Sequence, residues 1–198
     1  MPHSVMWAPI AIATGGAGAL AIRPATQADA PTLARWDADP SVIACTTDDP
    51  NAQQAFAGIV WADEIAANGD LTCYYIAELD GRPIGAMQVI DPYGEPTHYW
   101  GEIEPNLRAI DIWIGDAADR NKGYGALMMG LAIDACFADP AVTAIIIDPL
   151  NSNTNAHRFY RRLGFKPAGR RLFNGRDDCL VHRLERADWR PKETDKGN

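Results

Sequence analysis

Apolar residues along the chain change near residue 70 from helical spacing to strand-like runs. Before that point, residues 19–23 predict a short strand, and Thr26 is a candidate N-cap for a helix that continues through Trp36. Between Ala52 and Ala67, apolar residues recur at roughly helical spacing, which predicts a second helix that ends at Asn68-Gly69. The early part of the chain is therefore expected to form one strand and two helices.

Two pairs of strand-like runs follow, each joined by a dipeptide that is typical of a tight hairpin turn. Asp80-Gly81 joins the first pair and Asn174-Gly175 joins the second. The runs are 71–79 with 83–90, and 166–173 with 177–184. Both pairs are expected to be antiparallel.

Residues 91–106 and 107–115 show two different patterns. The first segment is rich in proline, glycine, acidic and aromatic residues, and it predicts a long loop that borders a substrate cleft. In the second segment every other residue from 110 to 114 is isoleucine, and Asp111 and Trp113 lie between them. Side chains alternate between the two faces of a strand, so the isoleucines are expected in the core and Asp111 and Trp113 on the opposite face.

A glycine-rich turn, R-N-K-G-Y-G at residues 120–125, lies between that strand and a helix-like segment, residues 126–137. Its glycines let the backbone turn tightly and approach a ligand, and the unpaired amides that open the helix suit a pyrophosphate. Such turns are also common as plain connections. The β-branched run 142–147 then predicts a buried parallel strand reached by a right-handed crossover. Asn153 opens a further helix that ends at Gly164.

The composition is that of one globular domain, with 198 residues of which 47% are hydrophobic. We expect a flexible N-terminal arm over residues 1–18, the domain over 19–188 and a frayed tail over 189–198. The apolar start has no Lys or Arg before it and lacks the length of a membrane span. The four cysteines are scattered and do not cluster with the histidines, which favours a reduced, cytoplasmic chain without a metal site.

The net charge of −8 argues against nucleic acids and anionic membranes as partners. It favours a cationic small molecule or a peptide, although acidity also serves solubility alone. The sequence leaves the choice between a monomer and a homodimer open.

Two segments carry a resemblance to a known family. The turn R-N-K-G-Y-G resembles the acyl-CoA pyrophosphate loop of the GNAT superfamily of N-acetyltransferases, and N-T-N-A-H-R-F-Y-R-R-L-G-F, residues 153–165, resembles its second signature. The resemblance covers residues 21–185. It implies a GNAT fold of α+β or α/β class, with a central mixed, mostly antiparallel sheet, a splayed parallel strand pair and about four flanking helices. It also implies acetyl-CoA as cofactor.

Within the superfamily, A-I-D-I-W-I-G and F-A-D-P-A-V-T-A-I-I-I-D-P-L-N-S-N look most like the aminoglycoside 6′-N-acetyltransferases. This resemblance implies that Asp111 accepts the proton of the attacking amine, directly or through water, that Asp148 holds a cationic substrate, and that Tyr160 is the general acid. An alkylammonium is not a nucleophile near neutral pH, so the reaction needs such a carboxylate, and the departing thiolate needs a proton donor. Without the resemblance, both aspartates could be ordinary strand-end residues and Tyr160 a core residue.

The resemblance also implies binding residues, with backbone amides near Trp113 and Ile114 polarising the thioester carbonyl. The implied cofactor-binding residues are Ile112, Trp113, Ile114, Arg120, Asn121, Lys122, Gly123, Tyr124, Gly125, Asn153 and Tyr160. The implied substrate-binding residues are Asp111, Asp148, Trp113, Trp100, Glu102 and Glu104. The tryptophans, with Tyr99, could instead be core aromatics, and the two glutamates could form a solvated loop face.

The chain differs from the aminoglycoside enzymes after the first helix, where they carry a pair of tryptophans and this chain has S-V-I-A-C-T-T, residues 41–47. The leading interpretation is an acetyl-CoA-dependent aminoglycoside N-acetyltransferase, an antibiotic-resistance function, with direct transfer in a ternary complex. A siderophore-type hydroxylysine acyltransferase is an alternative, but those enzymes tend to carry His where this chain has Asp111. Other small amines, peptides and a non-catalytic acyl-CoA-binding role are further alternatives, and the presence of Asp111 and Tyr160 argues against the last.

Overall fold

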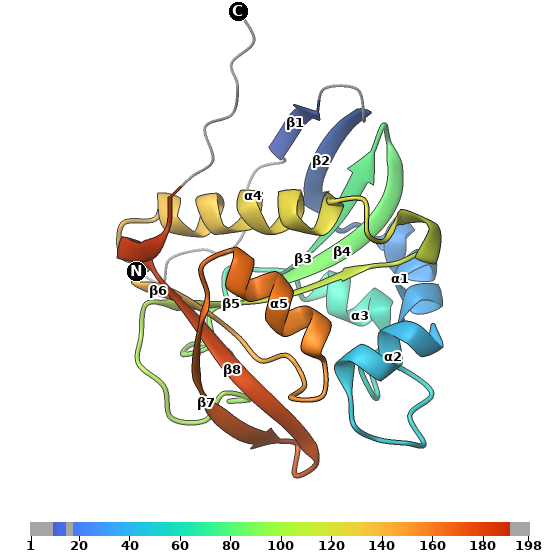
Figure 1. Cartoon of the computed structure of the whole chain (residues 1–198). Helices are drawn as coiled ribbons and strands as arrows, with labels where there is room; N and C mark the ends of the chain where they lie inside the picture. Colours follow the sequence, from blue (N-terminus) through green and yellow to red (C-terminus); the bar gives the residue numbers. More distant parts are fainter. Residues whose placement is uncertain (1–9, 15–17, 191–198) are drawn as a thin grey trace, which may run out of the picture.

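The computed structural model describes residues 10–14 and 18–190, which form one open sheet flanked by helices (Figure 1). The strands are β1 (Ile10–Thr14), β2 (Gly18–Pro24), β3 (Thr72–Leu79), β4 (Arg82–Ile90), β5 (Leu107–Ile114), β6 (Ala144–Ile147), β7 (Lys166–Phe173) and β8 (Asp177–Glu185). The α-helices are α1 (Ala30–Asp37), α2 (Pro40–Thr46), α3 (Trp61–Ala66), α4 (Tyr124–Ala138) and α5 (Thr154–Arg162). Short 3-10 turns cover Gln27–Asp29 (η1), Ala117–Asp119 (η2) and Arg186–Asp188 (η3).

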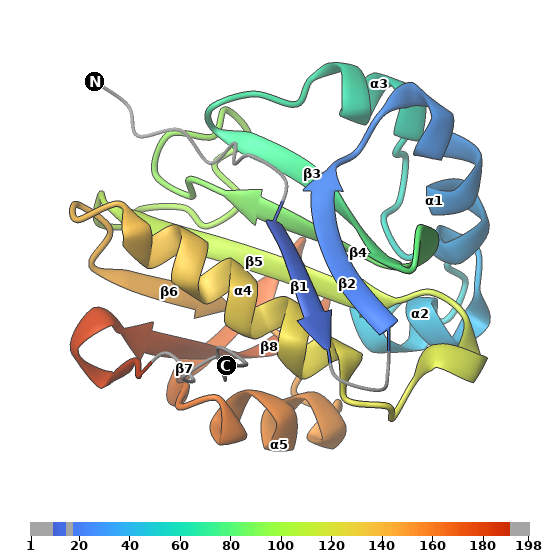
Figure 2. The same ribbon diagram turned by 90° about the horizontal axis from the view of Figure 1, so that it is seen from above.

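The strands lie in the order β1-β2-β3-β4-β5-β6-β8-β7. Among the described strands, β5 and β6 are the only parallel neighbours, and α4 connects them along one face of the sheet (Figure 2). The predicted mixed, mostly antiparallel sheet and its crossover are therefore confirmed. Both predicted hairpins are confirmed as well, because Asp80-Gly81 and Asn174-Gly175 have positive φ at both positions, as a type I′ turn requires.

Each face of the sheet has its own core. On one face α4 packs against the sheet through residues such as Met128, together with α5. On the other face α1 and α3 contribute Trp36 and Trp61. Strand β5 supplies both cores, with Ile110 in the first and Trp113 against the second, as its alternation predicts.

Strands β5 and β6 separate soon after they begin. The register pairs Leu107, Arg108 and Ala109 with residues 144–146 and then stops. Beyond Ala109, β5 continues to Ile114 with β4 as its partner on the other side. The splayed parallel pair expected for the fold is thus present, and one edge of the end of β5 has no neighbouring strand.

One predicted helix is shorter than expected. Residues 52–60 are irregular, and α3 begins only at Trp61. The cause is the buried Asp37, whose carboxylate accepts hydrogen bonds from the Phe56 amide (2.9 Å) and the Trp61 indole (3.1 Å), and whose carbonyl accepts the Ala55 amide (2.9 Å). The amides of Ala55 and Phe56 are therefore bonded to a residue outside the segment and do not take part in a helical ladder.

Helix α2 is absent from the sequence-based prediction, which expected about four helices where the described residues form five α-helices. Its start carries two recognisable signals. Asp39 is the N-cap and accepts a hydrogen bond from the Ser41 amide (2.8 Å), and Pro40 occupies the first helical position.

Two described features lie within the segments expected as the arm and the tail. Strand β1 lies within the segment expected as a flexible arm, and its backbone pairs with β2, whose outer edge would otherwise expose unpaired amides and carbonyls. Trp189, expected in the frayed tail, packs on the core and donates to Asp134 (2.7 Å). The rest of the arm and tail, residues 1–9, 15–17 and 191–198, lies outside the described residues. In the described part of the chain, no helix has the length and apolarity to cross a membrane.

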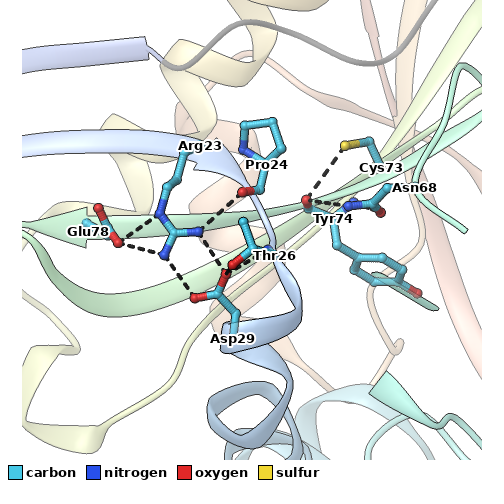
Figure 3. A network of polar contacts seen from close by, with 8 residues as sticks. All are labelled: Arg23, Pro24, Thr26, Asp29, Asn68, Cys73, Tyr74 and Glu78. Atoms are coloured by element: carbon cyan, nitrogen blue, oxygen red, sulfur yellow. Dashed lines mark hydrogen bonds and ion pairs between the residues drawn. The ribbon is translucent and has the colours of Figure 1, made fainter. Parts of the chain in front are cut away.

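An ion-pair network fixes the start of α1 to the sheet (Figure 3). Arg23 on β2 contacts Asp29 (2.8 Å) and Glu78 on β3 (2.8 Å). The Asp29 carboxylate also accepts the amide (2.7 Å) and hydroxyl (2.9 Å) of Thr26, the predicted N-cap residue. The start of α1 is therefore fixed to strands β2 and β3.

Gly115, which directly follows β5, has no room for a side chain. A Cβ there would lie 2.0 Å from the buried indole of Trp36. We expect Gly115→Ala to lower the free energy of unfolding by about 1–3 kcal/mol, because the indole or the backbone must move. Gly130→Ala in α4 is the matched control, since nothing lies within 4 Å of its Cβ position and alanine favours a helix. Urea denaturation measures both variants, and equal stabilities would contradict the prediction.

Candidate active site

A large cleft opens where β5 and β6 separate. Its volume is about 1830 Å³, and its lining includes the end of β5, the turn after β5, the end of β6, α5 and part of the loop 91–106. The lining contains most of the residues predicted for the site, namely Trp100, Asp111, Ile112, Trp113, Ile114, Arg120, Asn121, Gly123, Gly125, Asp148, Asn153 and Tyr160. The loop therefore borders a cleft, as its composition predicts.

Asp111 lies on β5 directly across from Gln88 on β4. Its carboxylate has no hydrogen-bond or ion-pair partner among the described residues. Burial raises the pKa of Asp111 to about 7, and the nearby charge of Asp148 adds to the shift. A free carboxylate with a pKa near neutrality is suited to accepting a proton.

Asp148 directly follows β6 and faces the same region of the cleft. Burial raises the pKa of Asp148, and the Tyr99 hydroxyl, which donates to its Oδ2 at 2.6 Å, opposes that shift. The two carboxylates come from neighbouring strands that have separated. Each is close enough to the other for its charge to disfavour a second charge.

Helix α5 brings Tyr160 to the two carboxylates. Asn153 caps the helix as predicted, since its side-chain oxygen accepts a hydrogen bond from the Ala156 amide (3.0 Å). The Tyr160 ring is buried, and its hydroxyl has no hydrogen-bond partner in the described part of the chain. Burial raises the pKa of Tyr160, and the charges of Asp111 and Asp148 add to this effect. The phenol therefore keeps its proton at neutral pH and can donate it.

The free edge of β5 presents backbone amides to the cleft. The Gly115 amide donates to the Ile84 carbonyl (3.0 Å) on the β4 side. Because backbone groups alternate along a strand, the amides of Ile112 and Ile114 point away from β4, where β6 has already diverged. The amide of Trp113, by contrast, points toward β4. Of the predicted pair near Trp113 and Ile114, only the Ile114 amide is therefore available to a ligand.

The Arg120 side chain holds the glycine-rich turn in place. Its guanidinium donates to the carbonyl oxygens of Ile114 (3.3 Å) and Gly115 (2.6 Å) and contacts Asp39 at the start of α2 (3.8 Å). The guanidinium is thereby engaged with the protein. The backbone amides of the turn after Arg120, by contrast, have no such partner among the described residues.

The backbone of the turn is shaped for an anion. Asn121 (φ 60°) and Gly123 (φ 86°) adopt the left-handed conformation, and Gly123 is the N-cap of α4. The amides from Asn121 to Gly125 donate to no group in the described part of the chain. They open the N-terminus of α4, where the helix dipole favours negative charge. At Gly125 the only atoms near the Cβ position are those of the Phe159 ring at 3.8 Å, so the backbone is open to close approach.

Four of the predicted residues do not line the cleft. Lys122 contacts Asp119 (3.9 Å), and the Tyr124 side chain is buried in the core. Glu102 is exposed, and Glu104 contacts Arg183 (2.8 Å). For the two glutamates the arrangement favours the solvated loop face over a substrate-binding rim.

The aromatic residues divide between the core and the cleft. Trp100 is 2% exposed and packs against Phe173 (5.3 Å), so it is chiefly a core residue. Tyr99 is 39% exposed and directs its hydroxyl to the cleft. Trp113 is partly exposed and packs against Phe56 (5.1 Å), a cleft residue that the sequence analysis did not single out.

Sequence reasoning also missed a polar row beside Asp111. Tyr74 on β3, Gln88 on β4 and Asp111 on β5 are neighbours in register, and the Tyr74 hydroxyl donates to Glu64 on α3 (3.3 Å). The Asn68 side chain accepts a hydrogen bond from the Tyr74 amide (2.9 Å) and donates one to the Tyr74 carbonyl (3.4 Å); Figure 3 shows the two residues side by side. Strand alternation indicates which residues of the hairpin share a face. The register that aligns them with Asp111 depends on long-range pairing that no local pattern carries.

A clasp joins the two sides of the cleft. Asp177, buried at the start of β8, accepts hydrogen bonds from the Thr47 hydroxyl (2.7 Å) and the Asp48 amide (2.9 Å). Arg176 contacts Asp49 (2.9 Å) beside it. The segment after α2 is thus attached to the β7–β8 turn.

Comparisons with known proteins identify a family and several relatives of this chain. A family model described as "Acetyltransferase (GNAT) domain" matches residues 25–173. The aminoglycoside N(6')-acetyltransferase type 1 of Klebsiella pneumoniae is 38% identical over 96 residues, and the match covers 48% of each chain. A kanamycin resistance protein of Rhizobium radiobacter is 36% identical over 76 residues, which is 38% of this chain and 70% of that protein. The chain spans about half the length of the Klebsiella relative.

A solved structure extends the likeness to most of the chain. The structure of AAC(6')-Ib in complex with ribostamycin and coenzyme A matches with a TM-score of 0.74 at 25% identity. The match covers 89% of this chain and 98% of that chain.

The raised pKa of Asp111 predicts a pH-dependent effect on stability. The reference pKa of an aspartate is 3.8, so the unfolded chain releases this proton at a lower pH than the folded protein does. Ionisation of Asp111 therefore destabilises the fold progressively from about pH 4 to about pH 7, with the full effect above that. We expect Asp111→Asn to unfold at a higher temperature than the wild type at pH 8, by a margin that shrinks toward pH 4.

Thermal unfolding between pH 4 and pH 8 measures this margin. The control is Asp70→Asn, which removes the charge of an exposed aspartate that lines the same cleft. A margin for Asp111→Asn that does not change with pH would contradict the predicted shift.

Proposed function

The chain belongs to the GNAT acetyltransferase family, and we propose that it transfers an acetyl group from acetyl-CoA to the 6′-amine of an aminoglycoside, directly within a ternary complex. One observation carries the proposal. The partner-free Asp111 carboxylate and the unpaired amides at the start of α4 line one cleft, so a base for an amine and a backbone site for a pyrophosphate lie together. The named relatives and the ribostamycin complex support an aminoglycoside as the acceptor.

The turn after β5 fits the pyrophosphate of acetyl-CoA. The amides from Asn121 to Gly125 would hold the phosphate oxygens, and Gly125 leaves the backbone open. When bound, acetyl-CoA supplies an activated acetyl group as a thioester. The amides of Ile112 and Ile114 would face the thioester carbonyl as hydrogen-bond donors.

The side chains of Asp111, Asp148 and Tyr160 would bind the amine and transfer the protons of the reaction. Asp148 would hold the substrate ammonium, and Asp111 would take its proton as the nitrogen becomes a nucleophile. Tyr160 holds a proton on its phenol oxygen that it would give to the departing sulfur. Each of these proton transfers is typically worth about 100-fold or more in rate.

The charge of the cleft suits a substrate with several amines. The carboxylates of Glu64, Asp111, Asp148 and Asp177 all line it. Such a cleft attracts polycations, and the attraction weakens as salt rises. The exposed part of Trp113, with Phe56, would pack against the sugar rings. We place the reaction in the cytoplasm, in agreement with four cysteines that are all free thiols.

Turnover tests the proposed chemistry directly. Purified protein is expected to release thiol from acetyl-CoA when kanamycin is present. Asp111→Asn should lower kcat about 100-fold or more while acetyl-CoA binding persists, because asparagine keeps the shape but accepts no proton. The Asp70→Asn variant is the control for the loss of one acidic group from the cleft.

A panel of amine acceptors tests the proposed substrate independently of the proposed acetyl transfer. Polyamines, hydroxylysine and basic peptides are tested beside kanamycin and tobramycin. Turnover with any of the former, but with no 6′-amino aminoglycoside, would refute the proposed substrate while retaining acyl transfer to an amine. In a susceptible bacterium, expression should confer kanamycin resistance that is lost with Asp111→Asn.

The backbone site for the cofactor is tested at Gly125. A Cβ at this position has room in the protein itself, so Gly125→Val should fold but obstruct close approach of the pyrophosphate. We expect the affinity for acetyl-CoA to fall at least tenfold, about 1.4 kcal/mol, by isothermal calorimetry. Gly130→Ala, in the same helix, should bind as the wild type does. Unchanged affinity in folded Gly125→Val would exclude this backbone contact.

A further inference from the structure

Resting on the proposed acetyl transfer, we propose that Tyr99 is a positioning residue that keeps Asp148 ionised and so makes Asp111 the carboxylate that accepts the proton. The two carboxylates would otherwise be similar in position and surroundings. Asp111 lies on β5 beyond the point where the parallel pair separates, Asp148 directly follows β6, and each is desolvated. A proton shared by such a pair has no fixed place unless a neighbouring group distinguishes the two carboxylates.

The hydroxyl of Tyr99 supplies that difference. It donates to Oδ2 of Asp148 at 2.6 Å, and no side chain of the described residues donates to Asp111. A hydrogen bond donated to a carboxylate favours its charged form. The bond leaves the other oxygen of Asp148 for the ammonium of a substrate, and it leaves both oxygens of Asp111 free.

The position of Tyr99 is fixed by its own loop. Its ring stacks on Phe173 with 4.6 Å between centroids and 10° between planes. The buried carboxylate of Glu95 accepts the Tyr99 amide (2.7 Å) and both the amide (2.7 Å) and hydroxyl (2.6 Å) of Thr97. Arg171 donates to the Trp100 carbonyl (2.8 Å). The hydroxyl is therefore held against Asp148 before any ligand arrives.

The other groups that face Asp148 do not replace Tyr99. Arg171 on β7 favours the charged form from a distance, but its guanidinium is engaged with the Trp100 carbonyl and the Phe173 ring. The negative charges of Asp177 on β8 and Asp111 on β5 disfavour the charged form of Asp148. The backbone of Asp148 itself favours the charged form. Two further neighbours, Cys179 on β8 and Tyr160 on α5, have raised pKa values because they are buried, with the Asp148 charge adding to the shift, and both stay neutral.

The proposed division has a balanced proton path. The ammonium pairs with ionised Asp148, its N–H bond breaks as an O–H bond forms on Asp111, and the freed nitrogen lone pair becomes the nucleophile. If Asp148 were protonated instead, the cleft would lose its cation ligand, and amine binding would weaken before the chemistry began.

Tyr99→Phe tests the proposal because it removes the hydroxyl and keeps the ring that stacks on Phe173. The protein without ligands is labelled with carbon-13 at the aspartate carboxyls and titrated by NMR. In the wild type we expect the Asp148 carboxyl to titrate at a lower pH than the Asp111 carboxyl. In Tyr99→Phe we expect the pKa of Asp148 to rise by about one unit. Tyr93→Phe removes a hydroxyl from an exposed tyrosine of the same loop and should change neither titration.

Kinetics give an independent readout. In Tyr99→Phe the amine KM should rise about tenfold at pH 7, and the acidic limb of kcat/KM should move to higher pH. Activity should recover toward pH 8.5, where both carboxylates are ionised, which a merely structural role of Tyr99 would not produce. A raised KM with unchanged carboxyl titrations would overturn the proposal and make Tyr99 a direct substrate contact. Absence of turnover with every amine would refute the proposed function, while the ligand-free titrations would still decide the role of Tyr99.

Discussion

The separation of β5 from β6 is the constraint on which the rest of the site depends. Strands that stayed paired would satisfy the amides of Ile112 and Ile114 and leave no opening between them. Separation exposes these amides at the sheet's centre, where buried backbone groups without partners are unfavourable. The start of α4 borders the same opening and adds further unpaired amides from Asn121 to Gly125. A single break in pairing thus creates both the space and the donors.

The opening also concentrates negative charge in a desolvated place. Asp111 and Asp148 raise the energy of the folded protein when both are ionised, and the phenol of Tyr160 adds a buried polar group. Residues outside the cleft order other parts of the fold. The Arg23 network fixes α1 to the sheet, and the buried carboxylate of Asp37 orders the segment before α3.

Sequence patterns predicted the elements whose structure depends on neighbouring residues. Alternation along β5 placed Asp111 and Trp113 on one face, turn dipeptides located both hairpins, and glycines marked the start of α4. Prediction failed where a distant partner decides the outcome. Residues 52–60 have helical spacing, but the amides of Ala55 and Phe56 donate to Asp37 instead of forming a helix. For Trp100 the sequence left the core and the cleft open, because its burial depends on Phe173, which comes from β7.

The residues of the candidate site also divide into those that the sequence could predict and those that it could not. Asp111, Asp148 and Tyr160 could be named in advance because the resemblance of their segments to known acetyltransferases implies them, and all three line the cleft. The side-chain engagement of Arg120 and the bond from Tyr99 to Asp148 could not, because each depends on the exact course of a loop. Helix α2 is a different case, since Asp39 and Pro40 carry its start signal in the sequence itself.

The clasp at Asp177 can form only late in the synthesis of the chain. Thr47 and Asp48 emerge early from the ribosome, yet their partner on β8 is separated from them by most of the sheet. Contacts of such large sequence separation form late, because a long loop must first be closed. The segment after α2 can therefore attach only after the β7–β8 hairpin has been synthesised. By then all the strands of the central sheet are already present in the chain.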